Sequence, residues 1–208
     1  NTAKKLNLYQ NEIIFYKKIS SIINLDTPKY YSDIYIKDNN GIILENLSKY
    51  EGSFNLNLNK DINLTLNIIK IISGMHNKFL FNSQKEIIPC MNNLSKVNEL
   101  VYHELLQQRF EYFLNKNKLI LNDHEVFTLS TIYHNFKTIT QKSSQFPLNF
   151  CHGDFKSPNI FYKNNCEPVF LDWQYIHLNK GVSDIAFLLV ESINFDSDIS
   201  DLILKYYY

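Results

Sequence analysis

The fold of this chain is decided by residues 150–174, which read FCHGDFKSPNIFYKNNCEPVFLDWQ. Two short apolar runs, 160–162 and 169–171, flank a polar turn, and this pattern predicts a β-hairpin. In an antiparallel pair, the residue before the first strand and the residue after the second lie at the same open end, about 5 Å apart. Asn159 and Asp172 are therefore expected to converge there.

The side chains at this open end suit a hard cation. One carboxylate and one amide oxygen, without a thiolate or imidazole cluster, are typical of Mg²⁺ shared with phosphate groups. Asp154 lies five residues before Asn159 on the loop that enters the hairpin, where it can face the same site and deprotonate an acceptor hydroxyl. The spacing His-x-Asp-x-Lys-x-x-Asn, with Asp172 thirteen residues after Asn159, matches the catalytic loop and metal-binding aspartate of kinases.

The rest of the chain mixes helical and β patterns. Two β-rich runs, 30–37 and 42–47, flank an Asp-Asn-Asn-Gly turn and predict a hairpin. A polar connector over 48–60 follows. Apolar residues at helical spacing predict helices over residues 5–23, 61–79 with Asp61 as N-cap, 95–115, from Asp123 onward, and 196–208. This order predicts an α+β protein in two lobes that meet near residue 48.

Three segments together carry a family resemblance. Residues 152–159, 171–174 and 181–186 resemble the aminoglycoside phosphotransferase and choline kinase superfamily, and most closely its choline-kinase-like branch that includes ecdysteroid kinases. Weaker likenesses to that branch's glutamate-bearing helix, hinge strand and large-lobe helix motif lie at residues 11–16, 43–47 and 75–79. The resemblance runs from about residue 8 to about residue 193.

The resemblance implies a protein-kinase-like fold in two lobes. A truncated small, ATP-binding lobe would occupy residues 1–48, and a mostly helical catalytic lobe residues 49–208. The enzyme would transfer the γ-phosphate of Mg·ATP to a hydroxyl group of a small molecule, so ATP and Mg²⁺ are the expected cofactors.

Roles in catalysis follow from the same resemblance. It implies that Asp154 is the catalytic base or hydroxyl-orienting residue and that His152 positions the catalytic loop. Lys156 would meet the transferring phosphate. Asn159 and Asp172 would bind magnesium.

Three further parts of the site are implied. Glu12 would hold the ATP-anchoring lysine of the small lobe, and the backbone of Glu45, Asn46 and Leu47 would pair with adenine. Asp184 would brace the catalytic loop through hydrogen bonds to its backbone. His76, by contrast, is interpreted as a packing residue.

Composition narrows the class of partner. Lysine and arginine number 21, aspartate and glutamate 21, which gives a formal net charge of +0. A nucleic-acid or anionic-membrane binder would show a basic excess, and no apolar run approaches the roughly 18 residues of a membrane span. We therefore expect a cytoplasmic protein that binds neither nucleic acid nor membrane.

The pattern also departs from a complete kinase. None of the five glycines precedes Glu12, so the glycine-rich phosphate loop and its strand lysine are missing. We expect a fragment cut at both ends that binds ATP poorly and is inactive as it stands. The main alternative is a pseudokinase that serves as a binding module. A protein Ser/Thr kinase fits less well, because the twelve residues from Asp172 to Asp184 leave no room for a peptide-binding activation segment.

Overall fold

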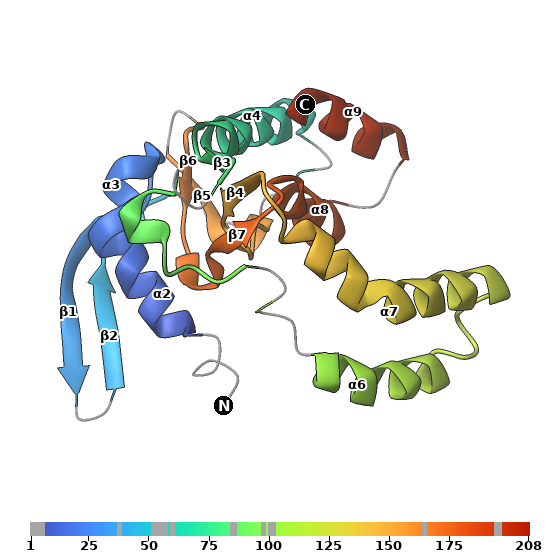
Figure 1. Ribbon diagram of the computed structural model, residues 1–208. Helices are drawn as coiled ribbons and strands as arrows, with labels where there is room; N and C mark the ends of the chain where they lie inside the picture. The colour runs from blue at the N-terminus through green and yellow to red at the C-terminus, as the bar shows by residue number, and fades with distance from the viewer. Residues whose placement is uncertain are drawn as a thin grey trace. The chain divides into compact units, whose positions relative to one another are not determined.

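The computed structural model describes residues 7–36, 39–50, 58, 61–83, 87–96, 99, 103–163, 166–193 and 197–208. The chain divides into two compact units (Figure 1). We call them the core unit, residues 1–94 with 146–208, and the helical unit, residues 95–145. The lobe boundary at residue 48 falls inside the core unit and stays a prediction.

The core unit begins with a helical run that matches the expected one. It consists of α2 (Leu8–Ile14), the π-helical turn η1 (Phe15–Ile19) and α3 (Ser20–Ile23). The apolar stripe turns inward, since Phe15 and Ile19 are fully buried. α2 packs against η6 (Trp173–Tyr175), the short 3-10 helix that follows the hairpin predicted over residues 160–171.

A β-hairpin follows this helix, as expected. Strands β1 (Tyr30–Ile36) and β2 (Asn39–Leu44) pair antiparallel, with Ile34 opposite Gly41. The second strand begins and ends three residues earlier than the predicted 42–47, so Asn39, Asn40 and Gly41 of the predicted turn belong to the strand, and residues 45–47 have no regular secondary structure. Most of the polar connector over 48–60 lies outside the described residues.

The core unit also contains three longer helices. They are α4 (Ile62–Lys78), α8 (Val182–Ser192) and α9 (Ser197–Tyr207). Asp61 caps α4 as predicted, because its carboxylate accepts a hydrogen bond of 2.9 Å from the amide of Leu64. α9 packs beside α4 (Figure 1). No helix in the described part of the chain is sufficiently long and apolar to cross a membrane.

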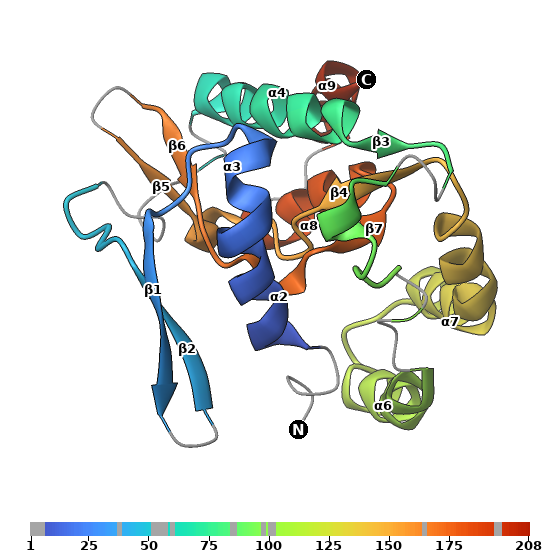
Figure 2. The same ribbon diagram turned by 60° about the vertical axis from the view of Figure 1, so that its left-hand side comes forward.

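Two small sheets carry most of residues 148–179 (Figure 2). The predicted hairpin forms from β5 (Ile160–Tyr162) and β6 (Pro168–Phe170). A three-stranded sheet in the order β3-β4-β7 was not predicted. Its strands have two to four residues, too few for a clear alternating pattern: β3 (Leu80–Phe81), β4 (Leu148–Cys151) and β7 (His177–Asn179).

The helical unit contains α6 (His103–Lys116) and α7 (Asp123–Ser143). α7 begins where predicted, and Asn122 and Glu125 form a reciprocal capping box at its start. The predicted first turns of the preceding helix fall partly outside the described residues. The rings of Phe110 and Tyr133 stack with centroids 4.1 Å apart and hold α6 against α7.

Candidate active site

The hairpin places Asn159 and Asp172 at one end, as predicted. Ile160 pairs with Phe170, and the amide of Leu171 donates a hydrogen bond of 3.1 Å to the carbonyl of Asn159. Asn159 therefore ends η5 (Ser157–Asn159) directly beside the strand that leads to Asp172. A carboxylate and a side-chain amide share this end of the hairpin.

The Asp154 side chain is held by two neighbours on the loop that enters the hairpin. Its Oδ2 accepts a hydrogen bond of 3.0 Å from Asn159 Nδ2 and pairs with Lys156 Nζ at 3.0 Å. The same Asn159 amide also donates to the Asp154 main-chain carbonyl at 2.8 Å. The hydrogen bond to Asp154 is the main cause that raises the pKa of Lys156. The structure thus brings Asp154, Lys156 and Asn159 into one cluster.

His152 links the loop to the hairpin from a fully buried position. Its Nδ1 accepts the amide hydrogen of Asp154 at 3.2 Å, and its Nε2 lies 3.0 Å from the carbonyl of Leu171. These partners require a neutral ring with the hydrogen on Nε2. Burial lowers the pKa of His152 and favours that neutral form. His152 therefore contacts the backbone on both sides of the site.

Asp184 contacts the loop that contains Asp154 and is 1% exposed. Its Oδ2 accepts from the amide of His152 at 2.8 Å, and its Oδ1 from the amide of Gly153 at 2.9 Å. Burial alone would raise the pKa of Asp184, but hydrogen bonds from His76 and the loop amides lower it below its usual value. The carboxylate is thus ionised and holds two consecutive backbone amides.

Gly153 is required by the same loop geometry. Its φ of +84° lies in the region that favours glycine. A Cβ atom there would lie 2.2 Å from the carbonyl oxygen of Tyr175. The turn between His152 and Asp154 can therefore pass close to η6 only without a side chain.

His76 is buried, as expected of a packing residue, and it also forms hydrogen bonds that were not predicted. Its Nε2 lies 3.0 Å from Asp184 Oδ2, and its Nδ1 lies 2.9 Å from the hydroxyl of Tyr207. The Asp184 carboxylate can only accept, so Nε2 of His76 carries a hydrogen and donates it to Oδ2. His76 is separated from Asp184 by 108 positions, and no local pattern indicates such a contact.

Cys151 joins His76 and Asp184 in a buried group whose potential ligand atoms lie within 4.8 Å of one another. The group is a hydrogen-bond network of the protein itself, because the Asp184 oxygens already accept from two loop amides and His76. Burial raises the pKa of the Cys151 thiol well above its usual value.

Glu12 lies on the helix that packs against the loop of Asp172. Burial, with a further contribution from the Asp172 carboxylate, raises the pKa of Glu12 to about 7. Tyr16, one helical turn later, is 4% exposed, and its hydroxyl has no hydrogen-bond partner among the described residues. A buried hydroxyl and two carboxylates therefore gather at one side of the hairpin end.

The raised pKa of Glu12 predicts how stability depends on pH. The folded state keeps the Glu12 proton up to about pH 7, whereas the ordinary pKa is 4.5, so unfolding releases that proton between these values. Unfolding therefore becomes easier as pH rises through this window, by roughly 1–2 kcal/mol after screening by solvent. Glu12→Gln lacks the proton and should remove this part of the slope.

Urea unfolding, followed by the fluorescence of the single tryptophan, tests this expectation at several pH values. The advantage of Glu12→Gln over wild type should grow from pH 5 to pH 8. Glu111→Gln, at an exposed position on α6, serves as the matched control and should follow wild type. Parallel curves for all three proteins would contradict the prediction.

The predicted adenine-binding segment lies after β2. The amide of Glu45 donates to the carbonyl of Lys29 at 2.8 Å, and the Glu45 carboxylate pairs with Lys49. Leu47 is buried, and Asn46 Oδ1 accepts from the amide of Ser48. Contact with adenine stays a prediction for this segment, as does contact of Glu12 with a lysine.

The residues at the hairpin end fit a magnesium ion. Asp172 offers a carboxylate and Asn159 an amide oxygen, and hard oxygen ligands are what Mg²⁺ prefers. Asn159 uses its Nδ2 for Asp154, which leaves Oδ1 as its ligand atom. The orphan hydroxyl of Tyr16 adds an oxygen that a hydrated ion could satisfy.

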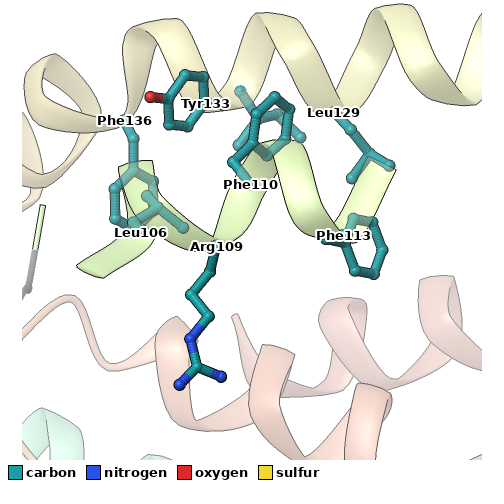
Figure 3. Close-up of a pocket in the computed structure, with 8 residues that line it drawn as sticks. Leu106, Arg109, Phe110, Phe113, Leu129, Tyr133 and Phe136 are labelled. Atoms are coloured by element: carbon teal, nitrogen blue, oxygen red, sulfur yellow. The ribbon is translucent and has the colours of Figure 1, made fainter. Parts of the chain in front are cut away.

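A separate cavity lies in the helical unit, between α6 and α7 (Figure 3). Its volume is about 330 Å³. The aromatic side chains of the two helices turn toward one another, while the chain's single arginine, Arg109, extends away from them. The lining residues are Leu106, Arg109, Phe110, Phe113, Leu129, Ile132, Tyr133 and Phe136. They include no carboxylate or imidazole, so the cavity suits an apolar ligand and not acid–base chemistry.

Comparison with known proteins gives a family and a fold. A model of the ecdysteroid kinase-like family matches residues 73–208. Protein LicA from Haemophilus influenzae is 25% identical over 134 residues, which make up 61% of this chain and 48% of LicA. The chain thus spans about half the length of this curated relative.

Solved structures confirm the predicted protein-kinase-like α+β fold. The choline kinase LicA from Streptococcus pneumoniae superposes with a TM-score of 0.59 and 16% identity, over 100% of this chain and 64% of LicA. An aminoglycoside phosphotransferase in complex with GDP and kanamycin superposes with a TM-score of 0.64 and 11% identity, over 99% of this chain and 67% of that enzyme. The resemblance inferred from residues 152–186 is confirmed as well.

Proposed function

The chain belongs to the ecdysteroid kinase-like family, and from this membership we propose that it is the catalytic part of a small-molecule kinase. The reaction is transfer of the γ-phosphate of ATP to a hydroxyl group. The observation that carries this proposal is the cluster of Asp154, Lys156 and Asn159 beside Asp172 at one end of the hairpin. A carboxylate, a cation and metal-binding oxygens are the groups that phosphoryl transfer needs.

Asp154 acts on the acceptor hydroxyl. Its side-chain contacts with Asn159 and Lys156 both use Oδ2, so we assign Oδ1 to the acceptor. The hydroxyl proton passes to Asp154 as the acceptor oxygen bonds to the γ-phosphorus, and the bond from that phosphorus to the β-γ bridging oxygen breaks to release ADP. Fixing the carboxylate in advance supplies orientation without reorganisation during the reaction.

Asn159, Asp172 and Lys156 arrange charge around the phosphate groups. Asn159 and Asp172 would hold Mg²⁺, which when bound neutralises charge on the phosphates. Lys156 Nζ lies within reach of Asp154 Oδ2 at 3.0 Å and is assigned to the transferring phosphate. A nucleotide role is supported by the neighbour in complex with GDP, and we place adenine beside the backbone of Glu45, Asn46 and Leu47.

A test is the release of ADP from Mg·ATP by the full-length enzyme, which includes the glycine-rich loop and strand lysine, in the presence of a panel of small alcohols, with Asp154→Asn as the variant. Turnover should fall by roughly 100-fold or more, because the amide cannot accept the hydroxyl proton. Nucleotide binding should change little, since the backbone around residue 154 is held by Asp184 and His152.

Asp201→Asn, an exposed position on α9, is the matched control and should keep wild-type turnover. Equal turnover in Asp154→Asn and wild type would remove Asp154 from the mechanism. If Mg·ATP binds saturably but no ADP is released with any of the alcohols tested, the result would instead favour the pseudokinase, which binds nucleotide and does not transfer phosphate.

A further inference from the structure

Gln174 connects the proposed magnesium ligand Asp172 to helix α2. Its side-chain Nε2 donates a hydrogen bond to Asp172 Oδ1. Its main-chain carbonyl accepts a hydrogen bond of 3.2 Å from the side chain of Asn11. Between them, the ring of Trp173 stacks on Phe15 with centroids 4.0 Å apart and an angle of 6°. One residue is thus held by the helix and holds the carboxylate.

Asp172 needs such a support because of its backbone. Its φ of 65° and ψ of 60° place it in the left-handed region, which costs free energy for residues other than glycine and persists only where the surroundings hold it. Without a hydrogen bond, the Asp172 carboxylate could also rotate about its side-chain bonds. A hydrogen bond to Oδ1 fixes the plane of the group and leaves Oδ2 for a cation.

An amide is well suited to this task. It donates a hydrogen bond without cancelling the charge, so Asp172 keeps its attraction for a cation, whereas a lysine would compete with the ion.

We propose that Gln174 is a positioning residue that orients Asp172 for Mg²⁺, and that Asn11 supports it from α2. Hydrogen-bond partners of metal-binding carboxylates typically contribute 10–100-fold to metal affinity. The inference rests on the proposed function, because it requires that Asp172 bind the ion.

The experiment is a titration of the full chain with MgCl₂ alone, followed by tryptophan fluorescence. Trp173 is the single tryptophan, is fully buried and directly follows Asp172, so its emission reports on this loop. Gln174→Ala should raise the half-saturating Mg²⁺ concentration by roughly 10-fold or more. Gln174→Met, which keeps the length and lacks the donor, should do the same. Gln10→Ala, at an exposed position of α2, is the matched control.

Substitution of Asn11 tests whether it acts on Mg²⁺ binding through Gln174 or only stabilises the fold. Asn11→Ala should raise the half-saturating concentration in the wild-type background, by less than Gln174→Ala does. In the Gln174→Ala background it should have no further effect on Mg²⁺, because its influence passes through the lost side chain. Binding of Mn²⁺, followed by electron paramagnetic resonance, gives an independent readout for wild type, Asn11→Ala, Gln174→Ala and the double variant.

Two outcomes separate this inference from the proposed function. If wild type saturates with Mg²⁺ and the Gln174 variants match Gln10→Ala, the positioning role is overturned while the magnesium site stands. If wild type shows no saturable response in either readout, both the positioning role and the magnesium site are overturned.

Discussion

Asp184→Ala is expected to lower the free energy of unfolding by about 3–5 kcal/mol, the range for removal of one partner from a buried charged network. The carboxylate accepts hydrogen bonds from the amides of His152 and Gly153 and from His76. Alanine leaves all three donors buried and unpaired, at a cost of about 1–3 kcal/mol for each group that finds no substitute. The effect should be measured by urea unfolding with Trp173 as the probe.

The size of the loss in stability distinguishes a buried carboxylate that holds the backbone from an exposed one that does not. Asp201→Ala removes a carboxylate from an exposed position of α9 and should change stability by less than about 0.5 kcal/mol. Asp184→Asn should fall between the two, because its carbonyl can serve one side while its amide hydrogens face a donor. A loss below about 1 kcal/mol for Asp184→Ala would show that the catalytic loop does not depend on this carboxylate.

The same hydrogen-bond network predicts that the folded protein loses stability at low pH. The pKa of Asp184 is lowered in the folded state, so its contribution to stability is fully present above the ordinary pKa of an aspartate. The contribution is lost as pH falls through the lowered value. The two groups therefore have opposite effects on the pH dependence of stability. Protonation of Asp184 at low pH destabilises the fold, and deprotonation of Glu12 destabilises it as pH rises toward 7.

Local sequence pattern was sufficient to predict the hairpin and the two side chains, Asn159 and Asp172, that lie at its open end. Antiparallel pairing fixes which residues lie at the open end of 160–171, so Asn159 and Asp172 could be placed together from spacing alone. The helix caps are equally local, and Asp61 caps α4 as predicted. Such features depend on residues only a few positions apart.

Long-range contacts could not be predicted in this way. His76 reaches Asp184 across 108 positions and Asn11 reaches Gln174 across 163, and a single sequence carries no signal of either pairing. The strands of the β3-β4-β7 sheet are too short for a periodic pattern. Gln174 could have been noticed only from its place two residues after Asp172, because its partners become visible only once α2 packs on η6.

Asp172→Ala is expected to abolish the response of Trp173 to Mg²⁺, with any remaining affinity weakened by more than about 100-fold. Loss of a partner that merely orients a metal ligand costs about 10–100-fold, and loss of the charged ligand itself should exceed that range. Asp172→Asn should also bind weakly, since it keeps the size of the side chain and removes the charge. The MgCl₂ titration of the full chain measures both.

Asn159→Ala gives the contrast that identifies Asp172 as the dominant ligand. Asn159 is neutral, and its Nδ2 is already committed to the carbonyl and Oδ2 of Asp154, so only Oδ1 is lost to the ion. We therefore expect a smaller loss of Mg²⁺ affinity than for Asp172→Ala. Turnover in Asn159→Ala should fall further than affinity, because Asp154 loses one of the groups that fix its orientation.

Asp201→Ala again supplies the matched control and should titrate like wild type. An ordinary titration of Asp172→Ala would exclude Asp172 as the magnesium ligand, whatever the effect of Asn159→Ala. Equal losses in Asp172→Ala and Asn159→Ala would mean that charge is not what holds the ion. The hairpin end would then act through geometry alone, since a hard cation attracted by charge must lose more when the carboxylate is removed than when the amide is.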